Sequence, residues 1–100
     1  MAIKFKDKWL EDFYFDDRRH RKIPSSLHTV LYRKLQMLDM AKEIMDLRSP
    51  PGNQLEALAG NLAGWHSIRV NKQYRIIFQW CGGHVLHAYF DPHTYKGASS

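Results

Sequence analysis

The sequence lacks the features of a membrane-bound, secreted or disulfide-stabilised protein. Its 100 residues include one cysteine, Cys81, so neither an intramolecular disulfide nor a cysteine-built zinc site is available. No apolar run approaches the ~18 residues of a membrane-spanning helix. No signal-peptide stretch follows the lysines of the N-terminal MAIKFKDKW. We therefore expect a cytoplasmic protein without membrane contact, in which Cys81 is a small residue at a strand end.

Acidic residues are in the minority. Fifteen Lys and Arg stand against ten Asp and Glu, which gives a net charge of +5 and a pI near 9.5. Such a charge favours polyanions, namely nucleic acid, a ribosome surface or an acidic protein segment. The densest basic run is Arg18–Lys22, which is either a solvated connection between helices or a contact for RNA or for a protein partner.

The hydrophobic pattern predicts helices in the first half of the chain. A hydrophobic content of 44% is enough for one packed core, so we expect a single domain over residues 1–100. A short strand is predicted at 2–6 and an amphipathic helix at 8–15. Pro24-Ser25-Ser26 predicts a helix start at which a serine oxygen caps the first amides. The helix that follows carries an apolar stripe of Leu27, Val30, Leu31, Leu35, Leu38 and Ala41.

The second half of the chain predicts a loop and then a sheet. Residues 46–64 hold two prolines and three glycines, so after a helical turn at 44–47 we expect an ordered loop. Strands are predicted at about 65–71, 73–80 and 84–91, joined as antiparallel hairpins. Alternation assigns His66, Ile68, Val70, Tyr74, Ile76, Phe78, Trp80, Leu86, Ala88 and Phe90 to the core face. It assigns Arg69, Arg75, His87, Tyr89 and Asp91 to an exposed, concave, polar face. The prediction is an α+β domain in which an N-terminal strand and two helices pack on a twisted antiparallel sheet.

The segment Asp46–Phe78 carries four ordered motifs, PPGN, LEALAG, AGWHSIRVN and QYRIIF. In these motifs the chain resembles the RelE-superfamily toxins of bacterial toxin–antitoxin systems, specifically the HigB type, and a looser likeness covers almost the whole chain. The resemblance implies a RelE-like fold. It also implies a ribosome-dependent mRNA endonuclease, or mRNA interferase, which cuts codons in the A site and inhibits translation.

The implied partners also follow from this resemblance. They are a helix-turn-helix antitoxin of the HigA type, the ribosome and its mRNA, with operator DNA bound only through the antitoxin complex. The basic run at 18–22 then becomes a candidate contact for ribosomal RNA or for the antitoxin. Two other functions stay open, a noncatalytic superfamily member that inhibits DNA gyrase and a nucleic-acid-binding or interaction module.

Cleaving RNA without a metal needs a base for the 2′-hydroxyl proton, cations for the phosphate and an acid for the leaving 5′-oxygen. The predicted polar face offers all three. HigB-type toxins commonly end in Asp-Tyr-His, which corresponds here to Asp91-Pro92-His93, with Pro92 departing from the pattern. The candidate catalytic residues are Arg75, Asp91 and His93. The candidate RNA- or phosphate-binding residues are Arg69, Arg75, Tyr89 and Tyr95.

Each candidate also has a structural interpretation. Arg75 would otherwise form a cross-strand ion pair with Asp91, and Asp91 would orient His93 or simply end its strand. Glu56 occupies a position where some relatives carry a histidine, so it has either an active role or a loop hydrogen bond. His66 is interpreted as a core residue, whereas His87 faces the site without a counterpart in the family. No metal-ligand spacing and no nucleotide-binding glycine loop are present, so no metal or cofactor is expected. Residues 94–100 are expected to form a flexible tail.

Overall fold

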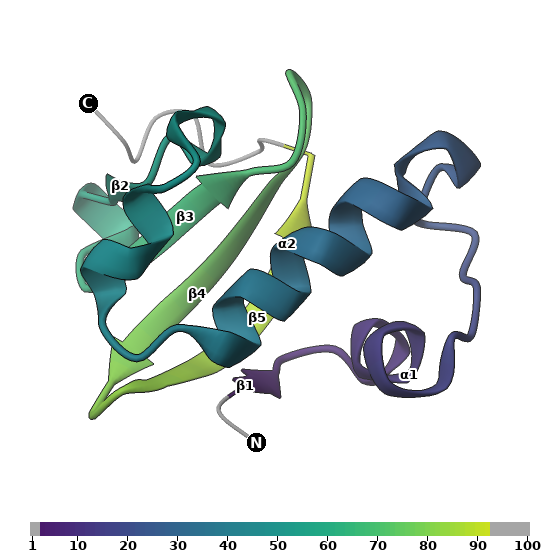
Figure 1. The fold of residues 1–100 in the computed structure, drawn as a ribbon, viewed down its shortest axis with the longest axis horizontal. Helices are drawn as coiled ribbons and strands as arrows, with labels where there is room; N and C mark the ends of the chain where they lie inside the picture. The colour runs from purple at the N-terminus through teal and green to yellow at the C-terminus, as the bar shows by residue number, and fades with distance from the viewer. Residues whose placement is uncertain (1–2, 93–100) are drawn as a thin grey trace.

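The sheet and the helices lie in two layers in the computed structural model, which describes residues 3–92 (Figure 1). The longer elements are β1 (Ile3–Phe5), α1 (Lys8–Asp16), α2 (His28–Met40), β2 (Glu56–Ala57), β3 (Trp65–Arg69), β4 (Arg75–Cys81) and β5 (His84–Asp91). Four short 3₁₀ helices connect them: η1 (Ser25–Leu27), η2 (Ile44–Arg48), η3 (Pro51–Asn53) and η4 (Gly60–Leu62). The strand order is β1-β5-β4-β3-β2, with β1 parallel to β5 and the other pairs antiparallel. The predicted α+β class and the predicted turn at 44–47 are confirmed. The expected tail at 94–100 lies outside the described residues.

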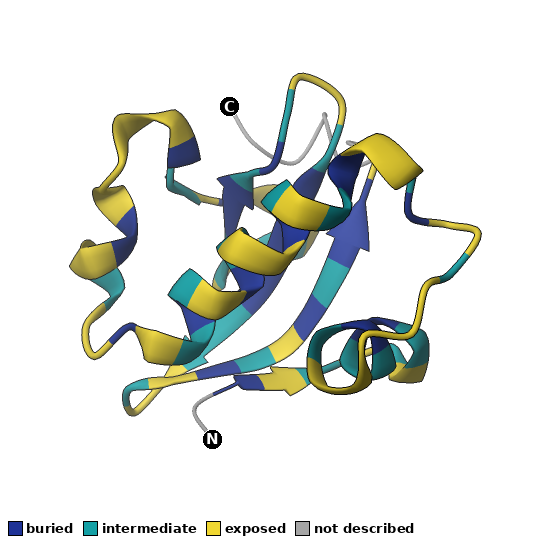
Figure 2. Ribbon diagram, turned by 45° about the vertical axis from the view of Figure 1, so that its right-hand side comes forward, coloured by how far each residue is buried: buried dark blue, intermediate teal, exposed yellow. Residues whose placement is uncertain are grey.

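Helix α2 packs its apolar stripe on one face of the sheet. Leu31, Leu35 and Leu38 have no exposed surface, and they share one core cluster with Ile68 and Phe78 of the sheet. Figure 2 shows the resulting contrast between a buried inner side and an exposed outer side of the helix. The predicted stripe is therefore confirmed, with only Val30 partly buried. In the described residues no helix is long and apolar enough to cross a membrane.

The predicted serine cap is wrong. Neither η1 nor α2 begins with a side-chain cap hydrogen bond. Instead, Ser25–Leu27 forms a 3₁₀ turn in which the Leu27 amide donates to the Pro24 carbonyl at 2.9 Å. Backbone bonding in this tighter turn takes the place that the serine oxygen was expected to fill.

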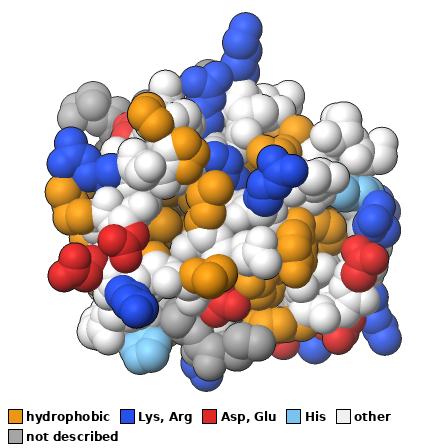
Figure 3. Space-filling view, in the orientation of Figure 1, with side chains coloured by type: hydrophobic (Ala, Val, Ile, Leu, Met, Phe, Trp, Pro, Cys, Tyr) orange, Lys and Arg blue, Asp and Glu red, His pale blue; other side chains and the backbone are white. Residues whose placement is uncertain are grey.

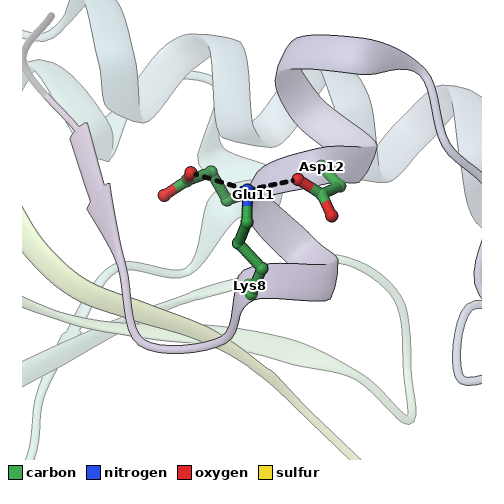
Figure 4. Close-up of polar contacts among 3 residues, drawn as sticks. All are labelled: Lys8, Glu11 and Asp12. Carbon is green, nitrogen blue, oxygen red and sulfur yellow. Dashed lines mark hydrogen bonds and ion pairs between the residues drawn. The ribbon is translucent and has the colours of Figure 1, made fainter.

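Helix α1 buries Leu10 and Phe13 and exposes a charged side. On that side Lys8 Nζ lies 2.8 Å from Asp12 Oδ1 and 3.5 Å from Glu11 Oε2 (Figure 4). These pairs join positions one turn apart, which supports the helix modestly because they are exposed to water. The helix ends one residue beyond the predicted boundary, at Asp16.

A bulge in β5 changes which side chains face the core. Between the pairs Ile77–Tyr89 and Gln79–Leu86, β5 contains one more residue than β4, and His87 has a positive φ of 56°. The extra residue reverses the alternation, so Val85 is buried in the core and Leu86 is not a member of it. The prediction that Leu86 faces the core is therefore wrong.

The second face of the sheet is partly covered by the loop that contains β2. Strand β2, which was not predicted, pairs with β3 and brings Leu58 over Ile77. Leu62, Trp65 and Tyr89 pack against these two residues. The face predicted to be polar therefore carries a small apolar cluster, and its polar groups are concentrated near the start of β4.

Candidate functional site

Three charged residues lie side by side where β3 ends, β4 begins and β5 ends. Arg75 is the register partner of Arg69 on one side and of Asp91 on the other. The predicted convergence of these three residues is confirmed. Residues directly opposite each other in antiparallel strands have Cβ atoms only ~4.5–5.5 Å apart, so the two arginines place positive charge together.

The prediction that Arg75 lies on an exposed surface is wrong, because Arg75 is only 5% exposed. Its Nε donates to Ser67 Oγ at 2.8 Å, and its Nη2 donates to the Gln54 carbonyl at 2.5 Å. The same Nη2 lies 3.1 Å from Glu56 Oε1. The segment around β2 covers the guanidinium and supplies two of its three partners. Arg75 is thus held in one orientation before any ligand arrives, which is the arrangement that favours charge stabilisation in a reaction.

The asparagine of the PPGN motif fixes that covering segment. Asn53 has no exposed surface, and its Nδ2 donates to the carbonyls of Leu47 and Ser49 at 3.1 and 3.3 Å. Lys34 Nζ of α2 donates to Asn53 Oδ1, and burial lowers the pKa of Lys34. The next residue, Gln54, adopts a left-handed conformation with φ of 44° and directs its carbonyl at Arg75. The motif therefore connects α2 to the arginine site.

Beside Arg75 the surface is hollowed into a pocket of ≈ 240 Å³, which we call the cationic pocket; it is lined by Gln54, Arg69, Asn71, Lys72 and Arg75. Asn71 shapes the turn, because its Oδ1 accepts from the amides of Gln73 and Tyr74 at 2.9 and 2.7 Å. Arg69 and Lys72 have no hydrogen-bond or ion-pair partner within residues 3–92. Their charge is therefore available to an anion such as a phosphate.

Glu56 belongs to this site more closely than the sequence indicated. Its carboxylate pairs with Arg75, and its side chain keeps 38% of its surface exposed. Its position in β2 places Glu56 opposite Ser67, which also contacts Arg75. The LEALAG motif was the available indication of Glu56. Ser67 belongs to the AGWHSIRVN motif and shares the strand face of Arg69, but its contact with Arg75 was not predicted. A carboxylate beside a fixed guanidinium can accept a proton from a bound hydroxyl.

Of the remaining candidates, Asp91 lies beside Arg75, and Tyr89 lies two residues before Asp91 in β5, opposite Ile77. Tyr89 packs edge to face with Trp65 at 5.9 Å between ring centroids. Lys6 Nζ lies over the Tyr89 ring, 4.6 Å from its centroid. Asp91 is 6% exposed and is register partner to Arg75. His93 and Tyr95 lie outside the described residues.

The two other histidines of this region differ in their setting. His66 stacks on Phe78 of the core at 6.0 Å, so its structural interpretation is confirmed, and burial lowers its pKa. His87 lies at the bulge of β5 and is exposed. Neither histidine lines the cationic pocket.

Comparison with known proteins identifies the family. Residues 3–93 match the model of the RelE-like toxin of the type II toxin–antitoxin system HigB. The chain belongs to the HigB-like family of RelE toxins. This HigB-like toxin is 64% identical over 95 residues to Toxin HigB-1 of Vibrio cholerae, an alignment that covers 95% of this chain and 100% of that protein. An uncharacterized protein of Haemophilus influenzae is 48% identical over 92 residues, with 92% of this chain and 91% of that protein covered.

The fold of this HigB-like toxin is also found among solved structures. The YoeB–YefM complex from Staphylococcus aureus matches with a TM-score of 0.55 and 21% identity, covering 91% of this chain and 94% of that chain. This likeness confirms the predicted RelE-like fold. Family membership confirms the predicted resemblance and identifies the chain as the toxin of a type II toxin–antitoxin pair, so that it has an antitoxin partner.

Proposed function

We propose that this HigB-like toxin is an mRNA interferase that cleaves A-site codons on the ribosome and so inhibits translation in the cytoplasm. The observation that carries this proposal is the cationic pocket, in which Arg69 and Arg75 stand opposite each other in register. A phosphodiester placed there meets the guanidinium of Arg69 and the amine of Lys72, with the largely buried guanidinium of Arg75 beside them. The cognate antitoxin, of the helix-turn-helix HigA type, neutralises the toxin, and operator DNA is bound only through that complex.

The chemistry assigned to the site needs no cofactor. Glu56 takes the 2′-hydroxyl proton, the 2′-oxygen bonds to phosphorus, and the bond from phosphorus to the 5′-oxygen breaks. His93 donates a proton to the departing 5′-oxygen, and Asp91 orients His93. The products are a 2′,3′-cyclic phosphate and a 5′-hydroxyl. Arg75 and Arg69 stabilise the charge that develops on the phosphorane-like transition state.

The test is single-turnover cleavage of A-site mRNA on purified ribosomes. We expect Glu56→Gln and His93→Ala to lower the rate about 10²–10⁴-fold, because each removes a proton-transfer group. Arg69→Ala and Arg75→Lys each remove part of the charge-stabilising arrangement and should lower the rate about 10²–10³-fold. His84→Ala is the matched control, since His84 is exposed in the distant β4–β5 hairpin.

Circular dichroism verifies that each variant is folded. If folded Glu56→Gln and His93→Ala proteins cut at the parental rate, the assigned acid and base are wrong. Pulse labelling after induction tests the wider proposal. Protein synthesis should stop before DNA synthesis, and the reverse order would replace the interferase with a gyrase inhibitor.

A further inference from the structure

Helix α2 carries a partly buried lysine, Lys34, that no carboxylate contacts within residues 3–92. In this range the only polar contact of its side chain is the hydrogen bond from Nζ to Asn53 Oδ1, and burial lowers the pKa of Lys34. A cation withdrawn from water without a carboxylate costs free energy that an apolar side chain would not. On the face where α2 lies, the Lys and Arg side chains are dispersed among acidic and hydrophobic ones, so a basic patch does not account for this lysine (Figure 3). The contact with Asn53 is the interaction that its charge serves.

Lys34 determines which way the Asn53 side chain is turned. An ammonium group has donors and no acceptor, so only the oxygen of the Asn53 amide can face it. The amide nitrogen is thereby turned toward the loop, where Nδ2 donates to the carbonyls of Leu47 and Ser49 at 3.1 and 3.3 Å. Because Asn53 has no exposed surface, water cannot replace these bonds when the amide is reversed. Lys34 thus selects the orientation of the amide that closes the loop.

The residues that follow Asn53 carry this fixed orientation to the arginine site. The Gln54 amide donates to the Pro51 carbonyl at 3.1 Å, which makes the turn compact. Gln54 has a φ of 44°, a conformation that residues with side chains rarely adopt and that persists only where the surroundings hold it. In this conformation its carbonyl accepts from Arg75 Nη2 at 2.5 Å. Two residues further along the chain, Glu56 Oε1 lies 3.1 Å from the same nitrogen.

Helix α2 is a firm support for this series of contacts, whereas the loop is not. Leu31, Leu35 and Leu38 of α2 have no exposed surface and belong to the core cluster, so the helix is held on the sheet on both sides of Lys34. The regular structure of the loop consists of two short 3₁₀ helices, η2 and η3, and the two-residue strand β2. The position of the loop therefore depends on side-chain contacts such as that between Lys34 and Asn53.

We propose that Lys34 and Asn53 are positioning residues for the cleavage of RNA. They hold the loop segment whose Gln54 carbonyl and Glu56 carboxylate contact Arg75, and so fix the guanidinium relative to the carboxylate. This inference rests on the proposed function, in which Arg75 stabilises charge and Glu56 takes a proton. Neither Lys34 nor Asn53 lines the cationic pocket, so neither meets the phosphodiester placed there. Loss of the contact should leave RNA binding in place and slow the chemical step.

Four substitutions separate orientation of the amide from packing and from charge. Lys34→Met keeps the apolar stem and removes the donor, whereas Lys34→Arg keeps a cationic donor and should preserve the contact. Asn53→Asp keeps the shape and the oxygen that faces Lys34, but it loses the donors to the loop carbonyls. Lys4→Met is the matched control, because it removes the same charge from an exposed position on β1. Thermal melting verifies that each variant is folded at the assay temperature.

Single-turnover cleavage of A-site mRNA over a range of ribosome concentrations separates chemistry from binding. Lys34→Met and Asn53→Asp should lower the maximal rate about 10–10²-fold, because a small misplacement of a reacting group is costly, and should leave the half-saturating ribosome concentration unchanged. Lys34→Arg should restore most of the rate, and Lys4→Met should cut at the parental rate. In an Arg75→Lys background, Lys34→Met should have little further effect, because residues that act through one another are not additive.

A second measurement does not depend on cleavage. NMR follows hydrogen exchange at the Arg75 Nε–H group, which donates to Ser67 Oγ at 2.8 Å. Its exchange should be at least about tenfold faster in Lys34→Met and Asn53→Asp, because the loop segment that covers the guanidinium then opens more often. The backbone amides of Leu35 and Phe78 in the core should keep their parental protection. Lys4→Met should exchange as the parent does.

A parental maximal rate in Lys34→Met would overturn the proposal, as would parental exchange at Arg75. A raised half-saturating ribosome concentration alone would make Lys34 an RNA contact, and faster exchange of the core amides would give it a role in global stability only. If Asn53→Asp does not fold, the two Lys34 variants decide the question. A parent toxin that does not cleave on ribosomes, with Arg75 exchange responding as expected, would contradict the proposed function and leave the positioning of Arg75 in place.

Discussion

At the scale of the residue, Arg75 combines a structural and a proposed catalytic role. Its guanidinium joins β3, through Ser67, to the loop segment that holds Gln54 and Glu56. An arginine in such a setting costs free energy to bury, and the surrounding acceptors and the carboxylate offset that cost. The same contacts fix its orientation toward the cationic pocket. Removal of the side chain should therefore affect stability as well as RNA cleavage.

The corresponding prediction concerns the stability of Arg75→Ala. The substitution removes the hydrogen bonds that Arg75 donates to the Ser67 hydroxyl and the Gln54 carbonyl, and a buried polar group that loses its partner costs about 1–3 kcal/mol. For a domain of this size the melting temperature should fall by about 4–8 °C per kcal/mol. Thermal circular dichroism measures the shift. Arg69→Ala is the control, because Arg69 has no polar partner within residues 3–92, and it should change stability by less than about 0.5 kcal/mol. Equal melting temperatures for the two variants would contradict the anchoring role of Arg75.

At the scale of the element, periodicity predicted most of the fold. The stripe from Leu27 to Ala41 identifies α2 because every third or fourth residue is apolar, and alternation in β4 separates the core residue Phe78 from Arg75. The face of Arg75 was predictable for the same reason. Its burial was not, because the covering strand β2 is two residues long and depends on contacts made by Asn53. The burial of Val85 in place of Leu86 could not be predicted either, since the residue pattern does not indicate the bulge in β5.

The prediction at this scale tests the packing of α2. Leu31→Ala and Leu35→Ala each remove a side chain that has no exposed surface, and such changes cost about 2–5 kcal/mol. Because a domain of this size has only about 5–15 kcal/mol of stability, each variant should show a clearly lower urea midpoint. Gln36→Ala, on the exposed side of the same helix, controls for the change in helix propensity. Parental midpoints in both leucine variants would show that the stripe does not form the core.

At the scale of the whole molecule, the sheet separates two surfaces of different chemistry. The cationic pocket offers positive charge on one side, and the hollows beside α2, lined largely by aromatic and aliphatic side chains, lie on the other. Asn53 lies between them, bonded to α2 through Lys34 and adjacent in sequence to Gln54, which holds Arg75. The net charge of +5 suits both a ribosome and an acidic antitoxin segment.

The last prediction concerns metal dependence, a property of the complete reaction on the ribosome. In the proposed mechanism protein side chains supply the base, the acid and the positive charge, so each function of a catalytic metal has a protein group assigned to it. Toxin treated with EDTA and then dialysed should cleave A-site mRNA at the parental rate once magnesium is restored to keep the ribosomes intact. Elemental analysis of the purified protein measures bound zinc and manganese in parallel. A Glu56→Gln sample treated identically shows whether residual cleavage comes from a contaminating nuclease. Stoichiometric metal that is lost together with activity, and that restores activity when it is added back, would overturn the proposed mechanism.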